Sequence, residues 1–284
     1  VGNGDDLKAL DIPVVQDMKG VGQNLQDHVN TSIKMECSQP ITLYKANAFP
    51  SNVKIGLEYF TRKTGAGATM HTEAGAFFKT RPNINIPDAQ HHFIPVLVYD
   101  NGRTWPDRHG FQCHVCPLRP ESTGSIKLRS NDPFQHPLID PNVLATEEDR
   151  RVTRDSVKIT RDIFTQSAMK EFVKAELAPG PDVRTDAEID AYIRESATTC
   201  YHPTSTAKMG TDELSVLDHE MKVRGVDGLR VVDASAMPQV NSGNTNAPIS
   251  MMAEKAADMI RGLAPMKPEW LPLADYDAVK PEGV

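Results

Sequence analysis

Near its carboxy-terminal end the chain reads Asn241-Ser242-Gly243-Asn244-Thr245-Asn246-Ala247-Pro248, a polar turn that runs directly into a helical pattern. Apolar residues then recur at helical spacing as far as Ile260, and Gly262 follows as a terminator. A proline near the first helical position sacrifices no hydrogen bond, because the amide there is unpaired in any helix. The first-turn amides and the positive end of the helix therefore face whatever lies at the turn, which suits an anionic cofactor.

A strand is predicted just upstream of this turn. The run Leu229-Arg230-Val231-Val232-Asp233-Ala234-Ser235 has β-strand composition, and Asp227-Gly228 before it is a hairpin signal. A carboxylate at the end of such a strand, here Asp233, can accept hydrogen bonds from ribose or ribityl hydroxyls. A plain turn aspartate is the alternative interpretation.

Two further residues carry potential chemistry. His202, in Cys200-Tyr201-His202-Pro203, supplies a group that titrates near neutral pH. Taken singly, His202 is typical of a structural histidine, and Asn244 is typical of a turn residue. Their meaning depends on the surrounding pattern.

That pattern resembles a known family. The stretch from Cys200 to Gly262 resembles the carboxy-terminal end of the glucose-methanol-choline (GMC) family of flavin-dependent alcohol oxidoreductases, and Gly20 to His28 resembles a loop of that family's flavin-binding domain. The resemblance implies FAD as cofactor and oxidation of an alcohol CH–OH group to an aldehyde or ketone. It assigns His202 as the base that takes the hydroxyl proton while hydride passes to flavin N5. Asn244 would hold the substrate oxygen in line without competing for the proton.

The resemblance also implies contacts to cofactor and substrate. The residues expected to bind the cofactor are those at the strand end and in the turn: Asp233, Ala234, Asn244, Thr245 and Asn246. Glu73 and Tyr201 are expected to border the substrate pocket. For Glu73 the alternative is a plain surface carboxylate.

A G-x-G-x-x-G turn, with which family members bind the flavin pyrophosphate, is absent from this sequence. We therefore expect two partners: an amino-terminal flavin-binding polypeptide that carries this turn, and a small-molecule alcohol. The first residues lack an initiator methionine, and Val1-Gly2 resembles the end of another family motif, so the chain is expected to begin inside something longer or to have been cut.

The resemblance leaves the reaction partly open. Within the family the chain looks most like the choline-dehydrogenase-like alcohol dehydrogenases and oxidases, with oxygen or a quinone-type molecule as acceptor. A flavin-retaining lyase of the same family is one alternative. A non-catalytic subunit that only completes a flavoprotein is another.

Composition excludes some other classes. The chain has 284 residues, of which 39% are hydrophobic and 24% charged, as in ordinary soluble globular proteins. Its net charge of −7 argues against nucleic acid as a partner. The longest apolar run, Phe93 to Tyr99, is too short for a transmembrane segment, and the first residues contain no secretory signal. A cytoplasmic location is expected, with peripheral contact to a membrane left open.

Four cysteines are too few for a disulfide framework in a chain of this size. Cys113 and Cys116 form a C-x-x-C step, which raises the possibility of zinc. The segment from Phe111 to Leu118 is, however, typical of a strand, on which side chains three apart face opposite sides. We therefore expect no metal site.

The remaining pattern predicts an α+β fold: an antiparallel-sheet substrate domain with flanking helices, plus the carboxy-terminal part of an α/β FAD-binding domain. Four divisions are expected: a flavin-domain segment 1–30, a substrate domain 31–198, a further part of the flavin domain 199–262, and a surface tail 263–284. Strands are predicted at 31–37, 74–78, 90–98, 110–118 and 125–128, and helices at 5–10, 53–61 and 185–196. A helical period is expected over 145–177, and a loop at 65–68. The glycines Gly20 and Gly22 predict a tight turn or close backbone approach.

Overall fold

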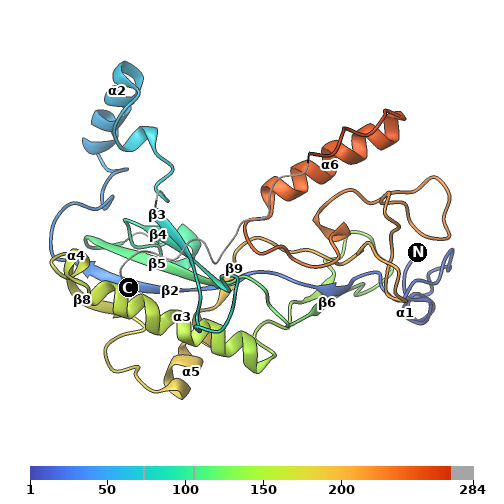
Figure 1. Cartoon of the computed structure of the whole chain (residues 1–284), viewed down its shortest axis with the longest axis horizontal. Helices are drawn as coiled ribbons and strands as arrows, with labels where there is room; N and C mark the ends of the chain where they lie inside the picture. Colours follow the sequence, from blue (N-terminus) through green and yellow to red (C-terminus); the bar gives the residue numbers. More distant parts are fainter. Residues whose placement is uncertain (73, 105, 270–284) are drawn as a thin grey trace.

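The computed structural model describes residues 1–72, 74–104 and 106–269 (Figure 1). Its centre is a six-stranded antiparallel sheet in the order β3-β4-β5-β2-β8, with β9 paired to β2. The strands are β2 (Val29–Cys37), β3 (Ala74–Phe78), β4 (Ala89–Ile94), β5 (Gly110–Pro117), β8 (Val173–Ala178) and β9 (Thr198–Thr199). The predicted antiparallel sheet is confirmed in β2, β3, β4 and β5, although β4 ends at Ile94 and not at 98. Strands β8 and β9 are not among the predicted strands, and the predicted strand at 125–128 belongs to a second sheet.

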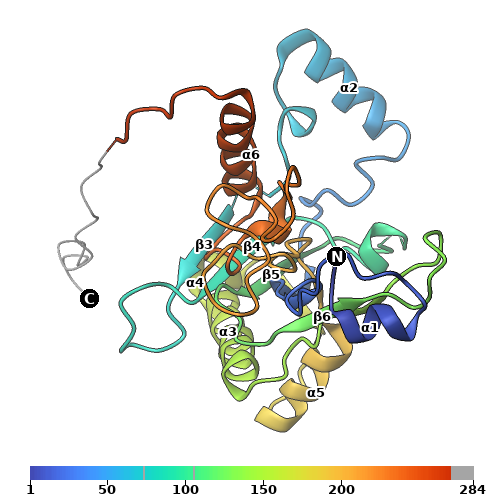
Figure 2. The same cartoon turned by 90° about the vertical axis from the view of Figure 1, so that its right-hand side faces the viewer.

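The two faces of the sheet differ because side chains alternate along each strand. On β2 and β5 one face carries Ile33, Cys113 and Val115, which are buried in the main hydrophobic core. Helices α3 (Glu147–Thr165) and α5 (Asp186–Ser196) cover this face, while α2 (Ser51–Arg62) and α6 (Asn246–Arg261) rise on the other side of the sheet (Figures 1 and 2). The other face, which carries Gln112 and His114, is therefore polar.

Helix α3 begins where the sequence predicts. Thr146 caps it by accepting a hydrogen bond from the amide of Asp149, and the buried positions Val152, Val157 and Phe164 face the core. The expected helical period to residue 177 is wrong beyond α4 (Ser167–Lys170). Residues 173–178 form β8 instead, because their backbone completes the edge of β2. On the same helix Ile159 is half-buried and Ile163 is exposed.

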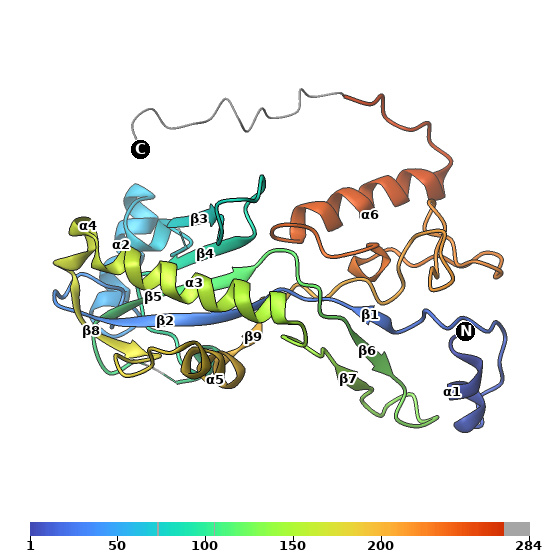
Figure 3. The same ribbon diagram turned by 60° about the horizontal axis from the view of Figure 1, so that its bottom comes forward.

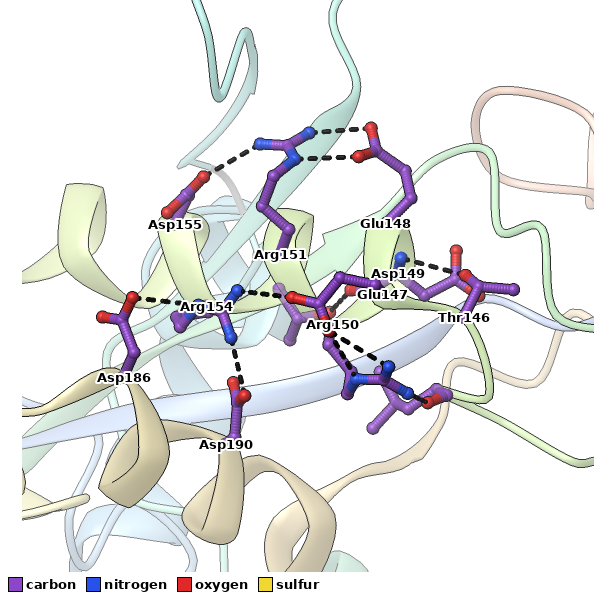
Figure 4. A network of polar contacts seen from close by, with 12 residues as sticks. Thr146, Glu147, Glu148, Asp149, Arg150, Arg151, Arg154, Asp155, Asp186 and Asp190 are labelled. Carbon is purple, nitrogen blue, oxygen red and sulfur yellow. Dashed lines mark hydrogen bonds and ion pairs between the residues drawn. The ribbon is translucent and has the colours of Figure 1, made fainter.

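A network of ion pairs joins α3 to α5 (Figure 4). The guanidinium of Arg154 donates to Asp190 at 2.6 Å and to Glu147 at 3.0 Å. Helix α5 starts with a capping box, in which Thr185 and Glu188 each accept from the other's backbone amide. The two helices thus form one layer beneath the sheet.

The amino-terminal segment forms α1 (Gly4–Ala9) and contributes β1 (Gln23–Leu25) to a small sheet with β6 (Gly124–Lys127) and β7 (Leu138–Asp140) (Figure 3). Between α1 and β1 the predicted close approach is confirmed. A Cβ on Gly20 would lie 2.0 Å from the carbonyl oxygen of Leu214, and one on Gly22 would lie 2.1 Å from that of Ile126. Only glycine fits at these two positions.

A second hydrophobic cluster joins this segment to the end of the chain. Met18 packs there with residues of the loops after β9, of η3 (Ala234–Ala236) and of α6 (Asn246–Arg261), among them Leu217, Ala236 and Ala256. Helix α6 has the predicted extent, and Gly262 caps it in the left-handed conformation, with φ of 68°.

The predicted strand over Leu229–Ser235 is wrong. The chain does reverse at 225–228, where Gly225 and Gly228 have φ of 72° and 73°, but only an isolated bridge between Lys222 and Arg230 follows. Residues 234–236 then turn into η3, for which Asp233 provides the cap. A single bridged pair does not extend into a ladder, so this segment is irregular.

Helix α2 (Ser51–Arg62) projects from the body (Figure 1), and none of its described residues is buried. Its apolar residues Leu57 and Phe60 are 65% and 75% exposed. The predicted loop at 65–68 contains the short helix η1 (Ala66–Ala68), and a similar turn, η2, spans Asp100–Gly102. Across residues 1–72, 74–104 and 106–269, the structure contains no helix with the length and apolar character of a membrane span.

The C-x-x-C step lies on β5, as the sequence predicts. Cys113 points into the core, whereas the sulfur of Cys116 contacts that of Cys200. The two sulfurs therefore do not converge. In the part of the chain that the structure describes, no group of three or more His, Cys, Asp or Glu side chains is arranged to hold a metal.

Candidate active site

His202 is positioned by strand-like pairing between residues far apart in sequence. The amide of Cys200 donates to the carbonyl of His28 at 2.8 Å, and Thr204 and Gln26 exchange backbone hydrogen bonds of 2.8 and 3.2 Å. Between them Tyr201 adopts a φ of 63°, which turns the chain at the residue before His202. The amide of His202 donates to Asp27 Oδ1 at 3.0 Å. The backbone on both sides of the imidazole is thus fixed.

The ring of His202 meets a second imidazole. Its Nδ1 lies 2.9 Å from Nδ1 of His28, whose Nε2 lies 3.0 Å from the carbonyl oxygen of Leu118. A carbonyl can only accept, so His28 donates from Nε2 and, when neutral, accepts at Nδ1. The proton between the rings therefore belongs to His202 Nδ1. Among the described residues nothing is hydrogen-bonded to His202 Nε2, which is left as a free lone pair.

The charge states agree with this arrangement. Burial lowers the pKa of His28 to about 4, so this ring is neutral near pH 7. Burial also lowers the pKa of His202, an effect that the nearby carboxylate of Asp27 opposes. A neutral His202 with a free Nε2 can accept a proton near neutral pH.

Asn244 is oriented by a strand residue. Gln90, buried on β4, donates from Nε2 to Oδ1 of Asn244 at 3.2 Å. The turn itself is closed by Asn241, whose side-chain amide donates to the carbonyls of Gly243 and Asn244 at 2.9 and 3.2 Å. With Oδ1 engaged by Gln90, the Nδ2 group of Asn244 is left to donate to a ligand.

The polar face of the sheet connects the two residues. His92 lies on β4 two positions from Gln90, on the same face. Burial lowers the pKa of His92, and the nearby His202 lowers it further. Beside it His114 on β5 contacts Asn30 Oδ1 through Nδ1 at 2.7 Å. The surface beside His202 and Asn244 is therefore rich in hydrogen-bonding groups that are neutral at pH 7.

The start of α6 can receive a negative group. The amides of its first turn have no partner inside the helix, Thr245 contributes no side-chain cap within the described structure, and the first turn contains no acidic residue. Asn246 and Ala247 are exposed there. These features fit an anionic or electron-rich ligand at the turn 241–246.

The other predicted site residues are placed as follows. Asp233 is exposed and accepts from the amide of Ser235 at 2.7 Å, and Ala234 follows it in η3. The side chain of Tyr201 is 72% exposed. Glu73 lies outside the described residues.

Sequence reasoning missed three residues of this site: His28, Gln90 and Asp27. The segment Gly20 to His28 contains a usable signal, because a histidine follows an acidic residue directly after the glycine turn. Gln90 has only the weaker signal of a polar residue at a buried strand position.

Comparisons with known proteins indicate the family. The family model for GMC oxidoreductase matches residues 120–253, which include His202 and Asn244. The oxygen-dependent choline dehydrogenase of Paraburkholderia phymatum is 48% identical over 266 residues, which cover 94% of this chain and 46% of that protein. The mitochondrial choline dehydrogenase of Mus musculus is 50% identical over 264 residues, or 92% of this chain and 44% of that protein.

Solved structures share the fold. Pyridoxine 4-oxidase from Mesorbium loti superimposes with a TM-score of 0.78 at 25% identity, over 93% of this chain and 48% of that one. A formate oxidase gives a TM-score of 0.82 at 23% identity, over 92% and 50%. The chain spans a little under half the length of the curated relatives it matches. On the matched model, the sequence identity and the shared fold, this chain matches the carboxy-terminal part of the GMC oxidoreductases.

Proposed function

We propose that this chain supplies the base and the substrate-binding sheet of an FAD-dependent enzyme that oxidises an alcohol CH–OH group. His202 is the base, and Asn244 holds the substrate oxygen. The amino-terminal flavin-binding portion, which carries the G-x-G-x-x-G turn, completes the enzyme. The names of the curated relatives make choline the first alcohol to test, and oxygen or a quinone-type molecule the first acceptors.

One observation carries this proposal: the 2.9 Å contact between Nδ1 of His202 and Nδ1 of His28. A histidine that only fills a core uses both nitrogens for structure. Here one nitrogen is committed to a buried, neutral partner, and the other is free to remove a hydroxyl proton. The half-buried position of His202 keeps that nitrogen within reach of a ligand.

Asn244 complements this base. A donor at Nδ2 stabilises negative charge on the substrate oxygen as the proton leaves it. Because Gln90 holds the opposite end of the same amide, the donor does not have to be reoriented during the reaction.

The residues present fit the flavin. The first turn of α6 has no side-chain cap, so its amides can stabilise negative charge on a ligand. Asn244, Thr245 and Asn246 lie at this end of the helix. Asp233 and Ala234 would contact hydroxyl groups of the cofactor. When bound, FAD supplies the acceptor for the hydride that leaves the alcohol carbon.

Each of the two proposed domains has its own hydrophobic cluster. Residues 1–30 and 199–262 share the cluster around Met18 and Leu217, and we assign both to the flavin domain. Residues 31–198 contain the main sheet and its own core, and we assign them to substrate binding. Residues 263–269 belong to neither cluster, and the rest of the predicted tail, 270–284, lies outside the described residues.

The test is to produce the chain alone and together with a G-x-G-x-x-G-bearing amino-terminal portion from one of the curated relatives. We expect a colourless chain by itself and a yellow complex on co-expression, and choline should bleach the flavin absorbance anaerobically. His202→Ala should lower the rate of bleaching by about 10²–10⁴-fold with flavin still bound. His136→Ala, at an exposed histidine, is the matched control. Full activity of His202→Ala at neutral pH would contradict the assignment of the base, and a yellow complex that no alcohol bleaches would favour the non-catalytic alternative.

A further inference from the structure

Two free thiols are in contact close to His202, and one of them belongs to Cys200, two residues before it in the sequence. Sγ of Cys116, on β5, lies 3.3 Å from Sγ of Cys200, although 84 positions separate the two residues. Both cysteines are free, Cys116 is fully buried, and Cys200 is half-buried. The sulfurs are in van der Waals contact, so a bond of ~2.05 Å requires them to approach by only about 1.2 Å.

The two sulfurs differ in a way that favours reaction. Either S–H can donate across this contact. The contact lowers the pKa of the Cys200 thiol and raises that of Cys116. The thiolate is the reactive form, and Cys200 is also the more accessible of the two. The pair thus combines an attacking sulfur with an adjacent resolving thiol.

The other two cysteines lack these properties. Cys37 and Cys113 lie in the main core, 6% and 4% exposed. Burial raises the pKa of Cys113 to about 12, which keeps it protonated. Any selective oxidation of this chain should therefore occur at the other pair.

We propose that Cys116 and Cys200 are a reversible oxidative modification site, at which a hydroperoxide converts the two thiols into a disulfide. The Cys200 thiolate attacks hydrogen peroxide, breaks the O–O bond and becomes a sulfenic acid, with one water formed. The thiol of Cys116 then attacks that sulfur, and the oxygen leaves as a second water. In sum, two thiols and one hydrogen peroxide give one disulfide and two waters, and the two electrons lost by sulfur reduce the peroxide.

The location links this chemistry to the active site, a consequence that rests on the proposed function. Cys200 donates its amide to the carbonyl of His28, and only Tyr201 separates it from His202. Drawing Cys200 toward Cys116 therefore displaces both imidazoles of the 2.9 Å pair. If oxygen is the acceptor, the enzyme itself produces hydrogen peroxide close to the two thiols. Formation of the disulfide then lowers the rate of turnover.

The first experiment maps the bond and does not depend on activity. The purified protein is titrated with hydrogen peroxide, the remaining thiols are blocked with N-ethylmaleimide, and non-reduced tryptic peptides are analysed by mass spectrometry. The peptide His109–Lys127 contains both Cys113 and Cys116, so the titration is repeated in Cys113→Ala to make the assignment unique. We expect a disulfide between the peptide with Cys116 and the peptide with Cys200, which dithiothreitol reduces. Cys37 should instead be found alkylated by N-ethylmaleimide.

The second experiment follows flavin reduction by the alcohol before and after oxidation in the co-expressed complex. We expect a loss of about tenfold or more, reversed by dithiothreitol, since a displacement of ~1 Å at an active site can cost up to about 100-fold. Cys116→Ser and Cys200→Ser should remove the dithiothreitol-reversible loss, and Cys37→Ala should retain it. Oxidation of Cys200 only to sulfinic acid, or linkage of other cysteines in preference to this pair, would overturn the proposal. A mapped disulfide without loss of activity would keep the modification site and refute its effect on His202.

Discussion

Gln90 and Asn244, 154 positions apart, are joined by a single hydrogen bond of 3.2 Å from Nε2 of the glutamine to Oδ1 of the asparagine. The bond connects β4 of the main sheet to the turn before α6. It links the main sheet, which we propose to bind the substrate, to the segment that we propose to bind the flavin. Gln90 of the main sheet therefore sets the orientation of the Asn244 amide.

This relationship predicts the effect of Gln90→Glu. A carboxylate has the same shape but can only accept, so Asn244 would turn its Nδ2 toward it and present Oδ1 to the substrate. We expect kcat/KM for the alcohol to fall by a factor that corresponds to ~1–3 kcal/mol, as for a lost hydrogen bond to a developing charge. Gln239→Glu, at an exposed position, serves as the control. Unchanged kcat/KM in Gln90→Glu would show that the orientation of Asn244 does not matter.

A substitution at His28 tests whether His202 is the base, because His28 fixes the tautomer of the His202 ring. In His28→Leu nothing accepts the Nδ1 proton of His202, so the proton can move to Nε2 and the base is lost in that fraction of molecules. We expect kcat to fall by about tenfold to a hundredfold, with flavin content unchanged. Nitrogen-15 chemical shifts of the His202 ring should change from a single Nδ1–H tautomer to a mixture.

The conservative variant separates positioning from stability. His28→Gln can still accept from His202 and donate to the carbonyl of Leu118, the two contacts that His28 makes at 2.9 and 3.0 Å. It should therefore recover most of the activity and the single tautomer. If His28→Leu and His28→Gln lost activity equally while both bound flavin, the tautomer argument would be wrong.

The sequence predicts His202 and Asn244 because each lies in a continuous local motif. Their partners come from distant segments: Gln90 lies on β4, and His28 lies between β1 and β2. A side-chain contact across more than 150 residues cannot be read from the local pattern around either residue. The same reason explains the two main errors. Residues 173–178 continue a helical pattern but pair with the edge of β2, and residues 229–235 have strand composition but meet only one bridged partner.

Close backbone approach, by contrast, does leave a local trace, because glycine is the only residue that permits it. Gly22 has φ of 76°, and a Cβ there would lie 2.1 Å from the carbonyl oxygen of Ile126. We expect Gly22→Ala to destabilise the protein by ~2 kcal/mol or more, measured by urea unfolding. Gly56, in the exposed helix α2, has nothing within 4 Å of its Cβ position. Gly56→Ala should be neutral or stabilising by up to ~1 kcal/mol, and equal effects of the two substitutions would contradict the packing described for β1 and β6.

Asp27 predicts the pH dependence of the reaction. Its carboxylate raises the pKa of His202 and thereby opposes the larger lowering caused by burial. Because the base works in its neutral form, kcat/KM should rise with pH through the pKa of His202, which lies below the ordinary value of 6.5. Asp27→Asn keeps an oxygen to accept the 3.0 Å hydrogen bond from the His202 amide but removes the negative charge. The pKa of His202 then falls further, so the rising limb of the profile should move to lower pH. Asp227→Asn, in the exposed turn before Gly228, is the control and should leave the midpoint in place. A midpoint that moves to higher pH in Asp27→Asn would mean that another group, and not His202, limits the reaction at low pH.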